Sequence, residues 1–121
     1  MFISISIGNI LKSLPIKLTC GGNIIRDFVY IDDIVDALVS IGIYESVPSI
    51  LNLGGGKAYT LMEVKCAIED ALHIKLSTEE VILRPVDIPQ SFLDIKLATS
   101  SIGYIPKISL QEGLLHTLRA A

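Results

Sequence analysis

The chain has 121 residues, of which 50% are hydrophobic and 19% are charged, and its formal net charge is −3. A chain of this length forms one domain, and its high apolar content excludes a disordered protein. The acidic balance and the absence of a basic cluster argue against nucleic acid as a partner.

The apolar content does not come from a membrane segment. The longest apolar stretch, residues 1–11, is interrupted by serine, glycine and asparagine, whereas a span needs about 18 apolar residues. Cys20 and Cys66 form neither a disulfide framework nor a metal-ligand spacing, so we expect them to be small buried residues of a cytoplasmic protein. We expect the surplus apolar surface to be covered by a partner, either the rest of a larger protein or a second copy.

The first part of the chain predicts two strands between two helices. Residues 1–13 combine helical spacing with a period of two, which favours a helix but leaves a strand open. Residues 16–19 alternate as in a strand, and residues 24–31 form a second extended segment. Asp32 is a suitable N-cap for a helix over about 33–43. The apolar face of that helix would consist of Ile34, Leu38 and Ile41.

The middle of the chain predicts one more strand and one more helix. Residues 50–53 read as a short buried strand that runs into a glycine loop. Thr60 and Glu63 form a capping box, which satisfies two backbone amides at the start of a helix. The apolar side of this helix would consist of Leu61, Val64, Ile68, Ala71 and Leu72.

The last part of the chain predicts a strand and two helices. Residues 81–83 are strand-like, and Asp94 can cap a short helix that ends near Gly103. Ser109 and Glu112 form a second capping box. The inward residues of the final helix would be Leu110, Leu114, Leu115 and Leu118. The whole pattern predicts a small mixed α/β domain over residues 1–121, with about three short strands and several helices.

Residues 54–57 read Gly-Gly-Gly-Lys, a run that invites interpretation as a phosphate loop. A Walker A loop would need glycine in place of Leu51 and serine or threonine in place of Ala58. A dinucleotide-binding turn would need glycine in place of Tyr59. We therefore interpret the run as a plain strand-to-helix connection that needs positive φ angles.

Several longer segments carry patterns in a fixed order. One begins at Arg26, followed by aspartate, a strand rich in aromatic and β-branched residues, and paired aspartates before an apolar helix. Another has Arg84 three residues before Asp87, with Asp-Ile-Lys-Leu-Ala at 94–98, and a third covers residues 103–114. Shorter patterns lie at 15–22, 52–56 and 61–64. Together these segments closely resemble the C-terminal, sugar-nucleotide-binding part of the extended short-chain dehydrogenase/reductase family, the NAD-dependent nucleotide-sugar epimerases and dehydratases.

The resemblance implies a role for each of the candidate site residues. The backbone around Leu18 and Thr19 would contact the base of a UDP- or dTDP-sugar. Arg26 and Arg84 would bind the diphosphate, because a planar guanidinium makes bidentate contacts with phosphate oxygens. Asp87 would hydrogen-bond the ribose hydroxyls or orient an arginine.

Ser91 occupies a position where some similar UDP-hexose 4-epimerases carry a bulky aromatic residue beside the sugar C2 substituent. A small residue there would leave room for an N-acetyl group, so Ser91 favours UDP-N-acetylhexosamines.

Each of these assignments has a simpler structural alternative. An arginine beside an aspartate on a strand edge is ordinarily a solvated or ion-paired surface feature. Asp32, Asp33 and Asp36 could suggest a cation site, but the preference for negative charge at helix N-termini explains the first two. His73 and His116 are far apart and read as surface residues.

The catalytic signature of the family is a tyrosine with a lysine four residues later, the lysine lowering the tyrosine pKa. The chain has tyrosines at 30, 44, 59 and 104, and the residues four positions later are Ile34, Pro48, Glu63 and Ile108. A glycine-rich dinucleotide turn is also missing from the sequence. We therefore expect no catalytic residue, no metal site, no Rossmann half and no NAD bound to this chain, although the resemblance implies NAD for an intact family member.

The sequence thus predicts the substrate-binding portion of a nucleotide-sugar epimerase or dehydratase, a fragment of a larger two-part enzyme. An alternative is a truncated, non-enzymatic module that self-associates through its exposed apolar face. A third possibility is a protein that only binds UDP-sugars. Its affinity would be poor, because an incomplete cleft offsets little of the cost of immobilising the ligand.

Overall fold

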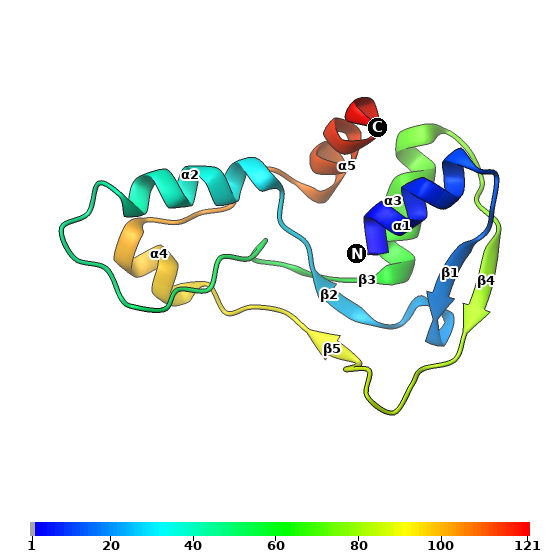
Figure 1. Ribbon diagram of the computed structural model, residues 1–121, viewed down its shortest axis with the longest axis horizontal. Coiled ribbons are helices and arrows are strands. Elements are labelled where there is room, and N and C mark those ends of the chain that lie inside the picture. Colours follow the sequence, from blue (N-terminus) through cyan, green and yellow to red (C-terminus); the bar gives the residue numbers. More distant parts are fainter. Residues whose placement is uncertain (1) are drawn as a thin grey trace.

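The computed structural model describes residues 2–121, which form short helices and strands in an elongated molecule (Figure 1). In chain order they are α1 (Phe2–Leu11), β1 (Ile16–Thr19), a 3₁₀ turn (Cys20–Gly22), β2 (Ile25–Asp27), α2 (Ile31–Ile41), β3 (Ala58–Thr60), α3 (Leu61–Leu72), β4 (Thr78–Val81), β5 (Gln90–Ser91), α4 (Lys96–Ile102) and α5 (Leu110–Ala120). The predicted small mixed α/β class is confirmed, with five short strands over these residues.

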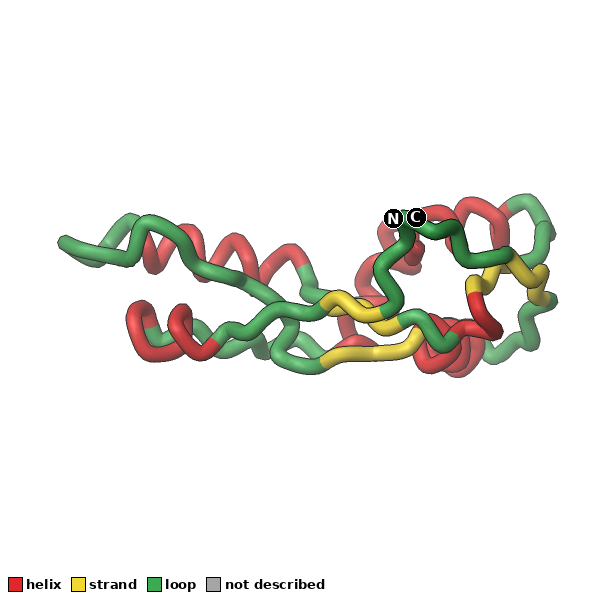
Figure 2. The backbone as a smooth tube through the Cα atoms, turned by 90° about the horizontal axis from the view of Figure 1, so that it is seen from below, coloured by secondary structure: helices red, strands yellow, loops and turns green. Residues whose placement is uncertain are grey.

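The molecule has a broad body and a narrower arm. The body contains α1, α3, α5 and the strands, whereas the arm consists of α2, α4 and the loop that follows α2 (Figure 1). Figure 2 shows α2 and α4 extending in the same direction from the strands as two layers. No helix within residues 2–121 is long and apolar enough to cross a membrane.

Two small sheets organise the body. In one, β1 pairs in parallel with β4, so that Ile16 lies opposite Thr78. In the other, β2 is central, antiparallel to β3 and parallel to β5. This register places Arg26 between Tyr59 on one neighbour and Ser91 on the other.

The core is divided between the body and the arm. One body cluster consists of Ile16, Leu18, Ile24 and Leu61. The other consists of Val64, Ala67, Ile68 and Leu114, between α3 and α5. The arm has its own cluster of Ala37, Ala98, Ile102 and Tyr104. The arm therefore has buried contacts of its own between α2 and α4.

Local signals in the sequence located the starts of α3 and α5 and the end of α4 correctly. Both capping boxes are present: the Thr60 hydroxyl accepts the Glu63 amide at 3.1 Å, and the Ser109 hydroxyl accepts the Glu112 amide at 3.2 Å. Gly103, with φ of 66°, ends α4 as predicted, whereas the N-cap of α4 is Ile95 and not the predicted Asp94. The helix at the N-terminus is confirmed from Phe2 onwards, while Met1 lies outside the described residues.

The prediction for α2 was wrong at its start and on its face. The helix begins at Ile31 after an N-cap at Tyr30, so Asp32 is not the capping residue. Asp33 is buried and accepts the backbone amides of residues 107 and 108 at 2.9 and 3.1 Å. The inward face carries Asp33, the small Ala37 and the predicted Ile41, which packs against the cluster around Ala37, so the predicted face was wrong at Leu38, which is 57% exposed.

Two strand predictions were also wrong. Residues 50–53 form no strand, and Ile50 is 78% exposed, because no neighbouring strand edge lies beside them in the described part of the chain. The segment predicted at 81–83 is a strand at Thr78–Val81 instead, set by its pairing with β1. Its residues 78–80 are polar and exposed, so an apolar pattern could not reveal it.

The predicted burial of several side chains was wrong. Cys20 and Cys66 are both exposed rather than buried. Cys20 lies in the 3₁₀ turn, and Cys66 lies on a part of α3 that the other helices leave open. Leu115 is 36% exposed, because α5 packs on the body mainly through Leu114. His73 and His116 lie on the surface as predicted.

Candidate functional site

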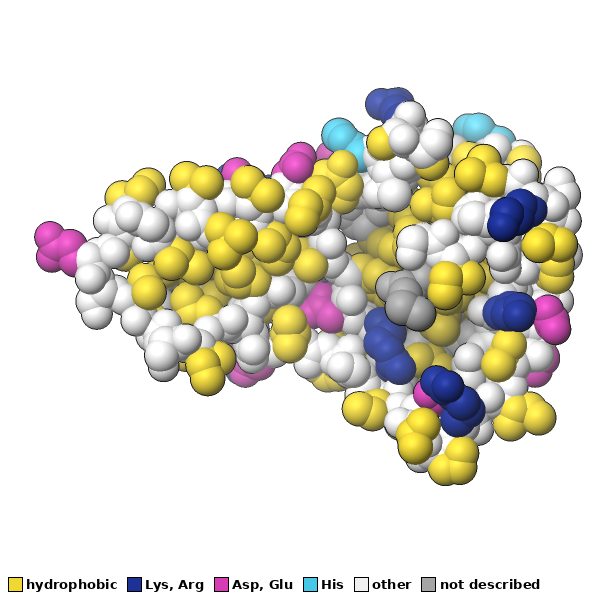
Figure 3. All heavy atoms as spheres, viewed as in Figure 1, with side chains coloured by type: hydrophobic (Ala, Val, Ile, Leu, Met, Phe, Trp, Pro, Cys, Tyr) yellow, Lys and Arg dark blue, Asp and Glu magenta, His cyan; other side chains and the backbone are white. Residues whose placement is uncertain are grey.

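A cleft of about 640 Å³ lies between β2, the start of α3 and the segment after β4. It contains four of the predicted site residues, namely Thr19, Arg26, Arg84 and Asp87. Its other walls are mostly apolar and consist of Phe2, Ile24, Phe28, Leu61, Val81, Ile82 and Leu83, together with Asp27. In Figure 3 the basic side chains of this face gather on the body, whereas the arm presents mainly apolar side chains.

Arg26 reaches the cleft from the central strand β2 and is half-buried. Its Nη1 donates to the carbonyl oxygens of Ile25 at 2.7 Å and Pro89 at 3.5 Å. These bonds tie the guanidinium to the chain just before β5. Arg26 is also close enough to Asp87 for its positive charge to help lower the pKa of that carboxyl group.

Arg84 and Asp87 form a tight pair that lines the same cleft. The Nε and Nη2 atoms of Arg84 donate to the two carboxylate oxygens at 3.2 and 2.9 Å, and the Arg84 amide donates at 3.0 Å. The side-chain bond from Arg84 is the main cause of the lowered pKa of Asp87. The pair uses one edge of the guanidinium, so the Nη1 edge can still meet an anion. Of the two roles implied for Asp87, orienting an arginine matches this geometry.

Leu18 and Ser91 do not line the cleft. The Leu18 side chain is 3% exposed and packs in the body core, so only its backbone could contact a ligand. Ser91 is exposed on β5, directly opposite Arg26 across the β2–β5 pairing. The structure thus brings Thr19, Arg26, Arg84 and Asp87 together, with Ser91 next to Arg26 on the neighbouring strand.

Sequence reasoning missed the part played by Asp27. Its carboxylate oxygens accept the backbone amides of Gly55 at 2.7 Å and Leu93 at 3.2 Å. Neighbouring residues of a strand point to opposite faces, so Asp27 is not an ion-pair partner of Arg26 but a bridge to other segments. The position of Asp27 next to Arg26 in a short strand was the only signal in the sequence.

The glycine loop is built around this carboxylate rather than around an open phosphate cradle. A Cβ atom at Gly54 would collide with Oδ2 of Asp27, and one at Gly55 would collide with the carbonyl oxygen of Phe28. Within residues 54–56 a positive φ occurs at Gly56 alone, at 72°. The predicted need for positive φ is therefore correct at Gly56, whereas the other two glycines are needed for space. The loop enters β3 rather than a helix.

Tyr104 is a structural residue of the arm. Its hydroxyl is buried and donates to the carbonyl oxygen of Gly54 at 2.8 Å. Burial, with smaller effects of the Asp33 and Asp27 charges, raises the pKa of Tyr104.

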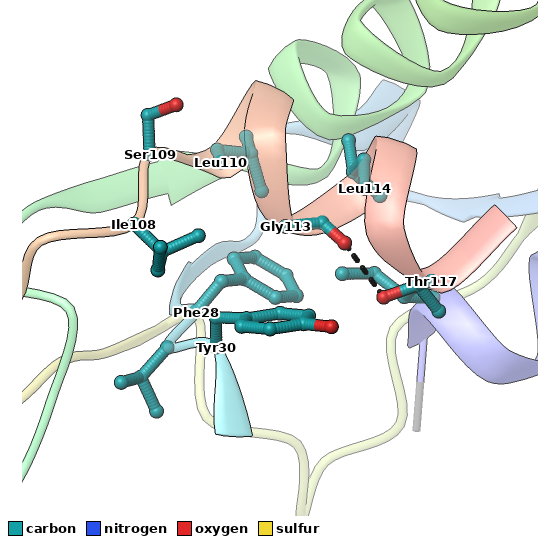
Figure 4. A pocket seen from close by; sticks show the side chains of 10 residues that line it. Phe28, Tyr30, Ile108, Ser109, Leu110, Gly113, Leu114 and Thr117 are labelled. Carbon is teal, nitrogen blue, oxygen red and sulfur yellow. Dashed lines mark hydrogen bonds between the residues drawn. The ribbon is translucent and has the colours of Figure 1, made fainter. Parts of the chain in front are cut away.

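A second pocket, lined by aromatic and aliphatic side chains, is much smaller. Its volume is about 70 Å³, and Figure 4 shows Phe28 and Tyr30 facing α5 across it. The hydroxyl of Thr117 at its edge donates to the Gly113 carbonyl oxygen at 2.7 Å. The Tyr30 ring packs so closely on α5 that a Cβ atom at Gly113 would lie 3.1 Å from it. This pocket is a packing gap beside the cleft.

Comparison with known proteins gives consistent relatives. No protein-family model matches the chain. The chain is 33% identical over 114 residues to UDP-glucuronate 4-epimerase of Thermodesulfobacterium geofontis, a match to 90% of this chain and 34% of that protein. It is 31% identical over 102 residues to UDP-glucose 4-epimerase of Mycolicibacterium smegmatis, covering 84% of this chain and 33% of the relative. The chain thus spans about a third of the length of the curated relatives that it matches.

Solved structures give the same answer for the fold. UDP-glucose 4-epimerase of Thermotoga maritima, solved with UDP-glucose, superposes with a TM-score of 0.86 at 26% identity, covering 97% of this chain and 38% of that chain. UDP-glucuronic acid 4-epimerase of Bacillus cereus, solved with UDP-glucuronic acid and NAD, gives a TM-score of 0.88 at 22% identity, covering 99% and 40%.

The fold and the sequence therefore match the C-terminal part of nucleotide-sugar epimerases, dehydratases and reductases. These relatives are members of the extended short-chain dehydrogenase/reductase family, and the predicted assignment of the chain to that family is confirmed.

Proposed function

We propose that this chain is the portion of an NAD-dependent nucleotide-sugar epimerase or dehydratase that binds the nucleotide-diphosphate-sugar. The observation that carries the proposal is the meeting of Arg26 and Arg84 at one cleft, although they come from distant parts of the chain. Two guanidinium groups at a partly apolar cleft suit a diphosphate, because each offers charge-assisted bonds to phosphate oxygens.

The carboxylate of Asp87 supports this reading. The side-chain hydrogen bonds of Arg84, together with the positive charges of both arginines, lower the pKa of Asp87, and the carboxylate accepts two hydrogen bonds from one edge of the Arg84 guanidinium. A positioned guanidinium loses less rotational freedom when it binds an anion than a mobile one. Thr19, at the end of β1, lines the same cleft and would contact the base, together with the backbone at Leu18.

We propose that this chain does not supply the cofactor site. The glycines at 54 and 55 approach Asp27 and Phe28 so closely that the loop has no cradle for a pyrophosphate. The glycine loop therefore does not fit a pyrophosphate, and we assign the cofactor to the remaining length that the relatives possess. Related structures are complexes with NAD.

The arm supports the proposal that a further protein surface completes the site. Its helix α2 carries exposed apolar residues at helical spacing, namely Ile31 at 61%, Val35 at 48%, Leu38 at 57% and Val39 at 62%. We call this row the arm stripe. A contiguous apolar surface of this kind is typical of an interface. We propose that a dinucleotide-binding half covers it, and self-association of two copies is the second candidate. The cytoplasmic location stays a prediction.

Titration with UDP, UDP-glucose and UDP-N-acetylglucosamine, followed by ¹⁵N NMR, tests the binding role. We expect weak binding, with shifts at Thr19, Arg26 and Asp87. Arg26→Lys and Arg84→Lys should each weaken binding roughly tenfold, because lysine keeps the charge and loses the bidentate contact. Arg119→Lys, on the exposed end of α5, is the matched control. The absence of any shift at millimolar UDP would refute a binding role for this chain.

A further inference from the structure

Asp27 joins three segments that are far apart in the sequence. Its own strand β2 lies in the middle of a sheet, its Oδ1 accepts the Gly55 amide at 2.7 Å, and its Oδ2 accepts the Leu93 amide at 3.2 Å. Gly54, adjacent to the first of these contacts, accepts the buried hydroxyl of Tyr104 at 2.8 Å. The carboxylate therefore stands where the cleft, the glycine loop and the arm meet.

The segment that carries Ser91 has few other attachments to β2. Strand β5 consists of residues 90 and 91 alone, and its pairing with β2 ends where Ser91 faces Arg26. Before this short ladder, the Pro89 carbonyl oxygen accepts the Ile25 amide at 2.9 Å. Beyond it, the bond from the Leu93 amide to Asp27 is the next attachment to β2. A two-residue ladder is weak alone, so the carboxylate bond stabilises its open end.

We propose that Asp27 is a positioning residue for Ser91, which lies beside the cleft on the strand next to Arg26. It binds no ligand; its carboxylate fixes the Leu93 and Gly55 amides and thereby holds Ser91 opposite Arg26. The ligand part of this inference rests on the proposed function, whereas the structural part does not. Loss of the carboxylate would loosen the segment around Ser91 while Arg84 and Asp87, which pair with each other, keep their geometry.

The bond can be detected without any substitution. In the unaltered protein, a scalar coupling across the hydrogen bond should connect the ¹⁵N nuclei of Gly55 and Leu93 with the carboxylate carbon of Asp27. Absence of both couplings, together with fast exchange of both amides, would overturn the proposal.

The variant Asp27→Asn tests the consequence for binding. It keeps the size of the side chain, but one of the two carboxylate oxygens is replaced by an NH₂ group, which cannot accept an N–H. We expect amide exchange at Leu93 or Gly55 to accelerate roughly tenfold, because one of the two amides loses its hydrogen-bond partner. The affinity for UDP should change less than about twofold, while the additional affinity from the sugar of UDP-N-acetylglucosamine is lost. Asp70→Asn, at an exposed position of α3, removes the same charge as a control.

The outcomes separate this proposal from the proposed function. If the unaltered chain binds neither UDP nor the sugar nucleotide, the proposed function fails, and the couplings and exchange rates still decide the role of Asp27. If Asp27→Asn leaves both exchange rates and the ratio of the two affinities unchanged, Asp27 is not a positioning residue. An equal loss of affinity for UDP and for UDP-N-acetylglucosamine would overturn it as well, because that result indicates general damage to the fold.

Discussion

Replacing Asp33 by alanine removes a buried carboxylate from the joint between α2 and the segment that leads into α5. Asp33 is 4% exposed, and its carboxylate oxygens accept hydrogen bonds from the backbone amides of Lys107 at 2.9 Å and Ile108 at 3.1 Å. Alanine offers neither amide a partner. Leaving a buried amide unpaired costs about 1–3 kcal/mol, and these two amides are partly buried, so the two together should cost about 2 kcal/mol. Domains of this size are stable by roughly 5–15 kcal/mol, so the loss is a large share of the total.

The neighbouring Asp32 provides a control that isolates this effect. It lies in the same first helical turn, carries the same charge and is exposed. Asp32→Ala therefore loses the favourable interaction with the helix N-terminus, worth about 0.3–1 kcal/mol, but not the two amide bonds. Urea unfolding followed by circular dichroism measures both free energies of unfolding. If the two variants differ by less than about 0.5 kcal/mol, the reasoning from buried amides is refuted.

Three further predictions follow from residues outside that joint. Gly54→Ala should destabilise the protein by about 1–3 kcal/mol, because the added Cβ meets the Asp27 carboxylate. Gly8→Ala, at a position in α1 with open space around it, should stabilise the protein by about 0.5–1 kcal/mol. Urea midpoints in the reverse order would contradict this prediction. The pKa values of Glu63 and Glu112 are lowered mainly by backbone hydrogen bonds in their capping boxes. Their contribution to stability is therefore present above pH 4.5, the ordinary pKa, and is lost as the pH falls through the lowered pKa values of the folded state. Titration of both carboxylates by ¹³C NMR, together with acid unfolding, measures this. The prediction is wrong if both groups titrate at the ordinary value. Leu38→Glu should change the free energy of unfolding by less than about 0.5 kcal/mol, because the side chain is exposed. The same variant should abolish self-association if two copies meet through the arm stripe. Unfolding of the variant would show that the Leu38 side chain is not exposed as described.

Features that depend on neighbouring residues in the chain could be predicted from the sequence. The capping boxes at Thr60 and Ser109 and the end of α4 at Gly103 need only a few adjacent residues, and all three are present. The strand predicted at 50–53 needed a partner edge, which the pattern of that segment could not reveal. The inward face of α2 likewise depends on what packs against it. Apolar spacing favoured Leu38, whereas the amides of residues 107 and 108 select the face that carries Asp33.

The candidate site divides in the same way. Arg26, Arg84 and Asp87 were named from their motifs, and the structure places them at one cleft, while their role in binding stays a prediction. Asp27 was not named, because its partners are backbone amides at positions 55 and 93 and backbone amides leave no signature of residue type. The local burial of Leu18 and the exposure of Ser91 were also beyond the pattern, since both depend on which strands pair.

The division of the core has a consequence for how this chain would behave in a cell. The arm is held by a small cluster of its own and carries an apolar stripe on the side facing away from that cluster. Segments with little buried contact open more easily than the rest of a domain. A partner that binds only the folded arm would raise the free energy of local unfolding of the arm, and this increase grows with the logarithm of the partner concentration. The fraction of chains with a folded arm would then depend on the concentration of the partner, and a chain without its partner would be cleaved by proteases faster than a bound one.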